Sequence, residues 1–189
     1  PVAEKTIKDC NIVIGFKRAI KSIDYIDKEK FIAKSLKEII NFINKNNDKD
    51  IAIVASGDPG FYGITDYIKS NYSGRLEVIP GLSSFQYMMA KLNLSWQGAH
   101  LGSLHGRDQE FIKEILENTV SIWLTDKVNS PQNICSKILG AGIIANVYVG
   151  ENLSYFDEKI VEASPKEISN MDFSDLCVMV VVNIDKVDN

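Results

Sequence analysis

Residues 51–63, with the sequence IAIVASGDPGFYG, constrain the fold more than any other part of the chain. The first five are apolar without polar alternation, which is typical of a strand buried on both faces of a parallel sheet. The turn SGDPG follows, and helical spacing resumes over residues 61–70. This order of strand, glycine-rich turn and helix predicts an α/β fold, in which ligands bind at the carboxyl ends of parallel strands.

The residue types in this turn suit close contact with a ligand. Gly57 and Gly60 lack a Cβ, so their backbone can take positive φ and come close to a bound molecule. Pro59 stiffens the turn, and Asp58 offers a carboxylate to a hydroxyl or amide donor. The spacing matches neither the Walker A loop nor the dinucleotide fingerprint. An ordinary tight connection remains an alternative explanation of the turn.

A second corner of the same kind lies about 20 residues further along the chain, at IPGLSS. A strand is predicted over 76–79, followed by the turn 80–84 and a helix to Leu92. Turns that follow parallel strands lie at one edge of the sheet, so both corners are expected to face one ligand. Ser83 and Ser84 offer hydroxyls at a helix N-terminus, although either is equally explained as a helix cap. Because neither corner contains Lys or Arg, the pair predicts a nucleoside pocket and not a phosphate pocket.

The rest of the chain alternates strands and helices in two predicted domains, 1–96 and 97–189. The first is expected to hold a mostly parallel sheet flanked by helices. The second is expected to hold a mixed sheet, because a hairpin through 159–162 requires antiparallel strands. The further predicted helices are 2–10, 31–44, 108–118 and 130–139, and the further strands are 12–15, 99–104, 120–125, 146–149 and 176–182.

Composition excludes several classes of function. A net charge of −4 with no basic stripe argues against nucleic-acid binding. No apolar run approaches the ~20 residues of a membrane span, and no signal peptide opens the sequence. Three widely separated cysteines and two histidines argue against disulfides and against a protein-bound metal site. We therefore expect a cytoplasmic protein with no nucleic-acid or membrane partner.

Three motifs, SGDPGFYG, VIPGLSSFQ and SLHGR, together resemble the tetrapyrrole methylases. SGDPGFYG with SLHGR is most similar to the branch that methylates C5 of cobalt-precorrin-7 or precorrin-6Y in cobalamin biosynthesis. The later segments WLTDKVNSPQNI and VGENLSYFDEKI are similar to that branch as well. The resemblance therefore covers nearly the whole chain.

The resemblance implies a two-domain α/β methyltransferase with S-adenosylmethionine in the cleft between the domains. It implies a tetrapyrrole substrate with or without cobalt, a homodimer, and a separate C15-methyltransferase partner, since the chain has no room for a C15 domain. The cofactor contacts that it implies are Gly57, Asp58, Pro59, Gly60, Ser83, Ser84, Leu124, Glu151, Asn152 and Leu153.

The motif SLHGR supplies the two residues expected to face the substrate. Arg107 is expected to bind a substrate carboxylate, and His105 to accept a proton near neutral pH. A structural hydrogen bond for His105 and a surface salt bridge for Arg107 are the alternatives. Tyr62 is expected either to line the pocket or to pack in the core. Asp126 either binds a donor or caps the turn that follows it.

The family pattern also contains a first strand and a Gly-x-Gly-Pro-Gly loop, and Pro1–Ala3 resemble the helix after that loop, so we expect this strand and loop to be missing here. Two other readings stay open: a non-catalytic nucleotide-binding or regulatory module of the same fold, and a tetrapyrrole methylase with another position specificity. A nicotinamide-dependent reductase is disfavoured by the glycine spacing. It also lacks a convincing acidic ribose ligand about 20 residues after the turn, since Glu77 precedes the second corner.

Overall fold

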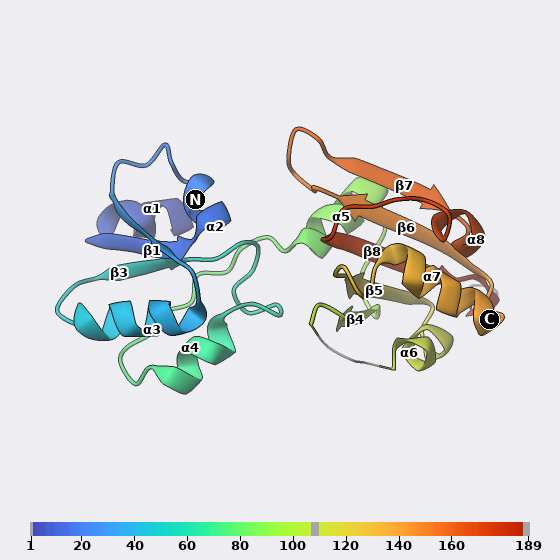
Figure 1. The fold of residues 1–189 in the computed structure, drawn as a ribbon, viewed down its shortest axis with the longest axis horizontal. Coiled ribbons are helices and arrows are strands. Elements are labelled where there is room, and N and C mark those ends of the chain that lie inside the picture. The colour runs from blue at the N-terminus through green and yellow to red at the C-terminus, as the bar shows by residue number, and fades with distance from the viewer. Residues whose placement is uncertain (1, 107–109, 187–189) are drawn as a thin grey trace. The chain divides into compact units, whose positions relative to one another are not determined.

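The computed structural model describes residues 2–106 and 110–186 of the chain. It contains two compact units, Pro1–Ser83 and Ser84–Asn189, each with its own sheet (Figure 1). The division falls earlier than the predicted boundary after residue 96. The reason is that helix α5 (Ser84–Leu92) lies against the second sheet and buries Met88 and Met89 completely.

The first unit is built on a three-stranded parallel sheet in the order β2-β1-β3. The strands are β1 (Ile12–Phe16), β2 (Glu29–Ala33) and β3 (Ile51–Val54). The predicted strand at residue 51 is confirmed, but its predicted burial on both faces is wrong. In the described part of the chain β3 is an edge strand and is half-buried, whereas the central strand β1 is buried.

Helices cover both faces of this sheet because successive residues of β1 point to opposite sides. Val13 packs in one cluster with Ile20, beside helices α1 (Val2–Asp9) and α2 (Lys17–Lys21). Ile14 packs in another cluster with Ile39 and Ile68 of α3 (Leu36–Lys45) and α4 (Thr65–Asn71). The sheet therefore forms the middle of three layers.

Three predicted elements of the first unit differ from the structure. The predicted helix 31–44 is a strand followed by a helix: Phe31 and Ile32 belong to β2, and α3 begins after its N-cap Ser35. The helix predicted from residue 61 begins at Thr65, because the residues before it form turns. The strand predicted over 76–79 is absent, since no described strand pairs with it and the side chains of Leu76 and Val78 are exposed.

The second unit is built on a five-stranded mixed sheet in the order β4-β5-β8-β6-β7, which confirms the predicted mixed sheet. Strand β4 pairs parallel with β5, while β8 is antiparallel to both β5 and β6, and β7 is antiparallel to β6. The last strand in the described residues, β8, therefore lies at the centre of the sheet. The bounds are β4 (His100–Ser103), β5 (Val120–Leu124), β6 (Ala145–Glu151), β7 (Lys159–Ala163) and β8 (Cys177–Asn183).

One face of this sheet carries the largest core of the described chain, centred on Trp123 and Met179. Helices α6 (Phe111–Glu117), α7 (Pro131–Gly140) and α8 (Pro165–Ile168) bury side chains in this core. A 3₁₀ turn η1 (Ile184–Lys186) follows β8. The predicted helices 108–118 and 130–139 correspond to α6 and α7, whereas α8 was not predicted. None of the helices in the described ranges is long and apolar enough to cross a bilayer.

Candidate functional site

The two predicted corners of the first unit lie against each other through the carboxylate of Asp58. Its Oδ1 accepts a hydrogen bond from the backbone N–H of Gly60, at 2.7 Å, within the first corner. Its Oδ2 accepts one from the backbone N–H of Gly81, at 3.3 Å, in the second corner. The carboxylate of Asp58, which we expected to bind a donor of the ligand, therefore already accepts two backbone hydrogen bonds and joins the two turns.

Glycine is required where the corners touch. A Cβ on Gly81 would lie 2.3 Å from the carbonyl oxygen of Gly57, closer than real Cβ atoms come to any atom. Gly57 itself has φ of +71°, in the left-handed region that favours glycine. The expected juxtaposition of the two corners is confirmed. It arises from backbone contact, because the residues before the second corner do not form the strand that we predicted.

The serines of the second corner differ in exposure. Ser83 is buried, whereas Ser84 is exposed as the first residue of α5. Pro59 fixes the end of the first corner, since its carbonyl oxygen accepts hydrogen bonds from the Thr65 hydroxyl at 2.6 Å and backbone at 3.2 Å. Tyr62 has φ of 48° and is 41% exposed, so its ring does not belong to the core. The result is a turn made of exposed glycine backbone without a cationic side chain.

In the second unit the strand directions bring three predicted groups to one edge of the sheet. Strands β4 and β5 are parallel, and β5 and β6 are both antiparallel to the strand between them. Leu124 and Gly150 accordingly pair with the same residue, Val178. The carboxyl ends of β4, β5 and β6 therefore place His105, Leu124 and the segment 151–153 along this edge. Arg107 lies outside the described residues.

Asp126 holds two neighbouring corners of this edge together. Its Oδ2 accepts a hydrogen bond from the backbone N–H of Gly106, at 2.7 Å, in the corner after β4. Its Oδ1 accepts bonds from Val128 N at 2.9 Å and Asn129 N at 2.7 Å, in the turn after β5. Asp126 therefore does cap its own turn, as one alternative held. It also binds the corner that contains His105.

These hydrogen bonds shift the pKa of Asp126. The bond from Gly106, followed by that from Asn129, lowers the pKa of Asp126, because hydrogen bonds to a carboxylate favour its charged form. The nearby His105 contributes in the same direction. Exposed His105 thus sits in a corner that is positioned by a fixed negative charge.

The lowered pKa makes a prediction about stability and pH. The bonds of ionised Asp126 stabilise the folded state above the unfolded pKa of about 3.9, and this stabilisation is lost as the pH falls through the lower folded value. We expect wild-type protein to exceed Asp126→Asn in melting temperature at neutral pH and this advantage to shrink below about pH 4. Thermal denaturation of both proteins over a pH series measures it. A difference that stays constant through the acid range would contradict the prediction.

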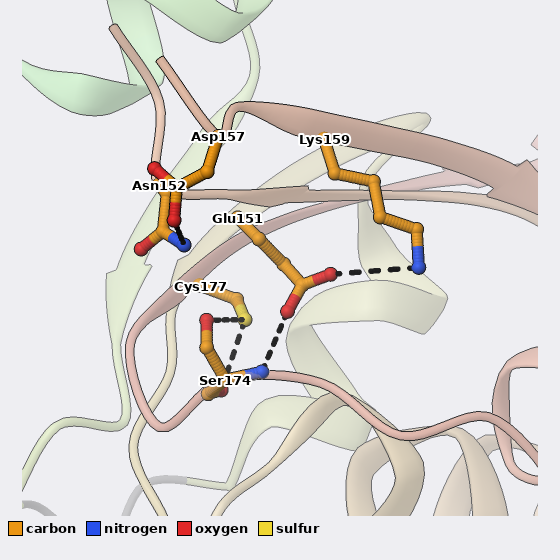
Figure 2. A network of polar contacts seen from close by, with 6 residues as sticks. All are labelled: Glu151, Asn152, Asp157, Lys159, Ser174 and Cys177. Carbon is orange, nitrogen blue, oxygen red and sulfur yellow. Dashed lines mark hydrogen bonds and ion pairs between the residues drawn. The ribbon is translucent and has the colours of Figure 1, made fainter. Parts of the chain in front are cut away.

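Glu151, at the end of β6, is almost fully enclosed in a polar network (Figure 2). Its Oε1 accepts a hydrogen bond from the backbone N–H of Ser174 at 2.6 Å, and its Oε2 lies 3.8 Å from Lys159 Nζ. Ser174 in turn contacts Cys177 at the start of β8. The carboxylate of Glu151 thus joins the end of β6 to the segment before β8, and its side chain is committed to these partners.

The two residues after Glu151 leave the sheet in a tight turn. Asn152 has φ of 46°, and its amide donates to Asp157 Oδ2 at 2.9 Å, away from the carboxylate of Glu151 (Figure 2). The side chain of Leu153 packs over Gly150, where a Cβ would lie 2.8 Å from a Leu153 methyl carbon. Close packing therefore fixes the conformation of segment 151–153.

Neither Cys135 nor Cys177 is an activated nucleophile. All three cysteines lie in the described ranges, are free and are buried. Burial raises the pKa of Cys135 to about 12 and that of Cys177 to about 11, so both thiols stay protonated at neutral pH. Residues 2–106 and 110–186 contain no group of three or more His, Cys, Asp or Glu side chains arranged to hold a metal ion.

Several positioning residues of these edges were not predicted. Gly81 stood in the quoted motif, but its close approach to Gly57 depends on the tertiary fold. Thr125 donates from its hydroxyl to Cys177 O at 3.1 Å, and Asn129 donates from its amide to Leu104 O at 3.1 Å. Asn129 has a sequence signal, because it stands in the segment WLTDKVNSPQNI. Ser174 has none, because its partner Glu151 is far away along the chain.

The arrangement of two α/β units with loops gathered at strand ends matches a known family. The family of Tetrapyrrole (Corrin/Porphyrin) Methylases matches residues 1–169, so the chain belongs to the tetrapyrrole methylases and is a methyltransferase. A probable cobalt-precorrin-7 C(5)-methyltransferase of Methanocaldococcus jannaschii is 34% identical over 94% of this chain and 88% of its own. A cobalt-precorrin-7 C(5)-methyltransferase of Salmonella typhimurium is 28% identical over 85% of this chain and 81% of its own.

Solved structures share the fold. A cobalamin biosynthesis precorrin-6Y methylase from Archaeoglobus fulgidus superposes with a TM-score of 0.74 at 19% identity, covering 96% of this chain and 89% of its own. A uroporphyrin-III C-methyltransferase from Thermus thermophilus, complexed with S-adenosylhomocysteine, has a TM-score of 0.74 at 15% identity, covering 97% and 90%. The predicted fold class, two α/β domains with a parallel and a mixed sheet, is confirmed.

Proposed function

We propose that this chain transfers a methyl group from S-adenosylmethionine to C5 of cobalt-precorrin-7 in cobalamin biosynthesis. The observation that carries the proposal is the similarity to proteins named for this reaction, over 88% and 81% of their lengths. A probable cobalt-factor III C(17)-methyltransferase of Methanothermobacter thermautotrophicus is 35% identical, but over only 48% of this chain and 28% of its own. The extent of the match therefore favours C5 over C17.

The corners of the first unit fit the nucleoside part of this cofactor. Gly57 and Gly60 expose backbone without side chains, and no Lys or Arg stands in segments 56–63 or 80–84. Such a surface suits an uncharged adenosine better than a phosphate group. We assign Gly57–Gly60 and Ser83 as its contacts, with Asp58 holding the corners in place. Ser84, Leu124, Asn152 and Leu153 are proposed as further contacts. Glu151 is proposed to contribute through its main chain, because its side chain binds Ser174 and Lys159.

Methyl transfer from a sulfonium requires no covalent bond between the protein and the substrate. When bound, S-adenosylmethionine supplies an electrophilic methyl group on a sulfonium. The residues of the chain hold donor and acceptor in line, exclude water and take up one proton. His105 is proposed to accept that proton, and Arg107 remains a prediction for binding a substrate carboxylate. The protonated thiols of Cys135 and Cys177 are compatible with an acceptor carbon that comes from the substrate.

Cations at the carboxyl edge of the first sheet fit an anionic macrocycle. Lys17 and Arg18 directly follow β1, and Lys34 follows β2, so all three stand at the edge that also carries the glycine turn after β3. All three side chains are exposed. We propose that they contribute to attraction of the substrate carboxylates. The predicted homodimer and the separate C15-methyltransferase partner remain predictions.

Methyl transfer tests the function directly. Protein incubated with methyl-labelled S-adenosylmethionine is expected to label cobalt-precorrin-7 and to leave cobalt-factor III unlabelled. S-adenosylhomocysteine at about 100 times its Kd is expected to stabilise the protein by about 2.7 kcal/mol. Thermal denaturation with and without this ligand measures the binding, and mass spectrometry locates the methyl group.

The outcomes separate the candidate functions. Stabilisation by S-adenosylhomocysteine without transfer to any corrinoid intermediate would favour the non-catalytic binding module. Transfer to a different ring carbon would correct the position specificity and keep the enzyme class. If the protein neither binds S-adenosylhomocysteine nor transfers a methyl group, the proposal is overturned.

A further inference from the structure

The carboxylate of Asp126 joins the corner that contains His105 to the rest of the second unit by a charge-assisted hydrogen bond. The corner after β4 contains Gly106, whose backbone N–H donates to Asp126 Oδ2 at 2.7 Å. Gly106 has φ of +63°, so the chain turns sharply at this point. A hydrogen bond to an ionised acceptor is about twice as strong as one between neutral groups.

The other oxygen of the same carboxylate serves a different loop. Asp126 Oδ1 accepts from Val128 N and Asn129 N, which closes the turn at the start of the β5–α7 connection. Asn129 also donates from its side-chain amide to Leu104 O, in the corner after β4. The two oxygens thus have different roles, because Oδ1 shapes the turn after β5 and Oδ2 holds the corner after β4.

We infer that Asp126 is a positioning residue that fixes the His105–Gly106 corner, and that this contact sets the efficiency with substrate and not the affinity for cofactor. The inference rests on the proposed function, which assigns His105 to the substrate and Leu124, on the strand before Asp126, to the cofactor. Loss of the Oδ2 contact alone releases the His105–Gly106 corner. It leaves the turn after Leu124 closed by Oδ1.

Asp126→Asn separates the two roles. Asparagine keeps a carbonyl oxygen for Val128 and Asn129, as it does in the turns that Asp and Asn share. Its amide nitrogen takes the place of Oδ2 and cannot accept the bond from Gly106. Asp172→Asn is the matched control, because Asp172 is an exposed aspartate of the same unit, in the segment between α8 and β8.

Hydrogen exchange tests the contact without reference to activity. We expect exchange of the Gly106 amide to rise about tenfold in Asp126→Asn, because a charge-assisted bond is removed, and to stay unchanged in Asp172→Asn. Exchange of the Val128 and Asn129 amides should rise less than that of Gly106, because their bonds to the asparagine oxygen persist and lose only the charge. If the variant does not fold, exchange of the Gly106 amide in the wild-type protein is the test. An unprotected Gly106 amide there would overturn the inference.

Kinetics test the consequence. At saturating S-adenosylmethionine we expect kcat/KM for cobalt-precorrin-7 to fall about tenfold in Asp126→Asn, while the Kd of S-adenosylhomocysteine changes by less than about twofold. Faster exchange with unchanged kinetics would overturn the role in substrate efficiency, and a parallel loss of cofactor affinity would overturn the separation of the two roles. If the wild-type protein transfers no methyl group, the proposed function fails, and the exchange measurement still decides whether Asp126 holds the corner.

Discussion

Gly81→Ala is expected to lower kcat/KM for methyl transfer by about a hundredfold, because the new Cβ forces apart the two corners assigned to the cofactor. That Cβ would lie 2.3 Å from the carbonyl oxygen of Gly57 and 3.1 Å from its carbonyl carbon. Both atoms belong to the backbone, so no flexible side chain can move aside. Displacement of the turn also breaks the bond from Gly81 N to Asp58. Steady-state kinetics and titration with S-adenosylhomocysteine measure the effect, and both are expected to deteriorate.

Gly140→Ala is the control for this substitution. A Cβ on Gly140, the last residue of α7, would meet no atom within 4 Å apart from its chain neighbours and the backbone of its own helix. Alanine there should leave cofactor affinity unchanged and hold or slightly raise stability, since alanine favours helix over glycine by up to about 1 kcal/mol. Wild-type cofactor affinity in Gly81→Ala would show that these corners do not form the binding surface.

Trp123→Ala is expected to destabilise the second unit by about 3–5 kcal/mol, the range for removing a large aromatic side chain from a core. Trp123 is fully buried, and its ring lies 5.0 Å from that of His100 and 6.1 Å from that of Phe111. Its indole N–H donates to the buried Ser121 hydroxyl at 2.9 Å, which would lose this partner. Urea denaturation followed by circular dichroism measures the change.

The second tryptophan of the chain provides the comparison. Trp96 is 44% exposed and makes an edge contact with Phe85 at 5.6 Å. Trp96→Ala should therefore cost about 0.5–1.5 kcal/mol, the range for an aromatic pair. Equal losses in the two variants would show that Trp123 is not the centre of the core.

Local sequence patterns predicted the elements whose hydrophobic period is unambiguous. The apolar run at Ile51 gave β3, and the helix predicted over 130–139 corresponds to α7. Phe31 and Ile32 were placed in a helix because they extend the spacing of Leu36 and the residues after it. The signal of a helix start, Ser35 three residues before Glu38, was present and would have separated strand from helix.

Features that depend on distant parts of the chain could not be read locally. Burial of β3 depends on which strand lies beside it, and a strand over 76–79 requires a pairing partner that the pattern does not reveal. The glycines and serines of the corners were found through the motifs that carry the family resemblance. The bonds by which Asp58, Asp126 and Glu151 join distant segments emerge only from the fold, because each carboxylate reaches a backbone N–H about 20 residues away in sequence.

The position of β8 has a consequence for the order in which the protein forms during synthesis. Strands β5 and β6 each pair with β8, and β8 is the last strand of the second sheet to leave the ribosome. Until residue 183 has emerged, β5 and β6 lack the strand that joins them, so that half of the nascent chain stays open. The described strands of the first unit end at residue 54 and the unit itself ends at Ser83, so it leaves the ribosome before the strands of the second unit are translated.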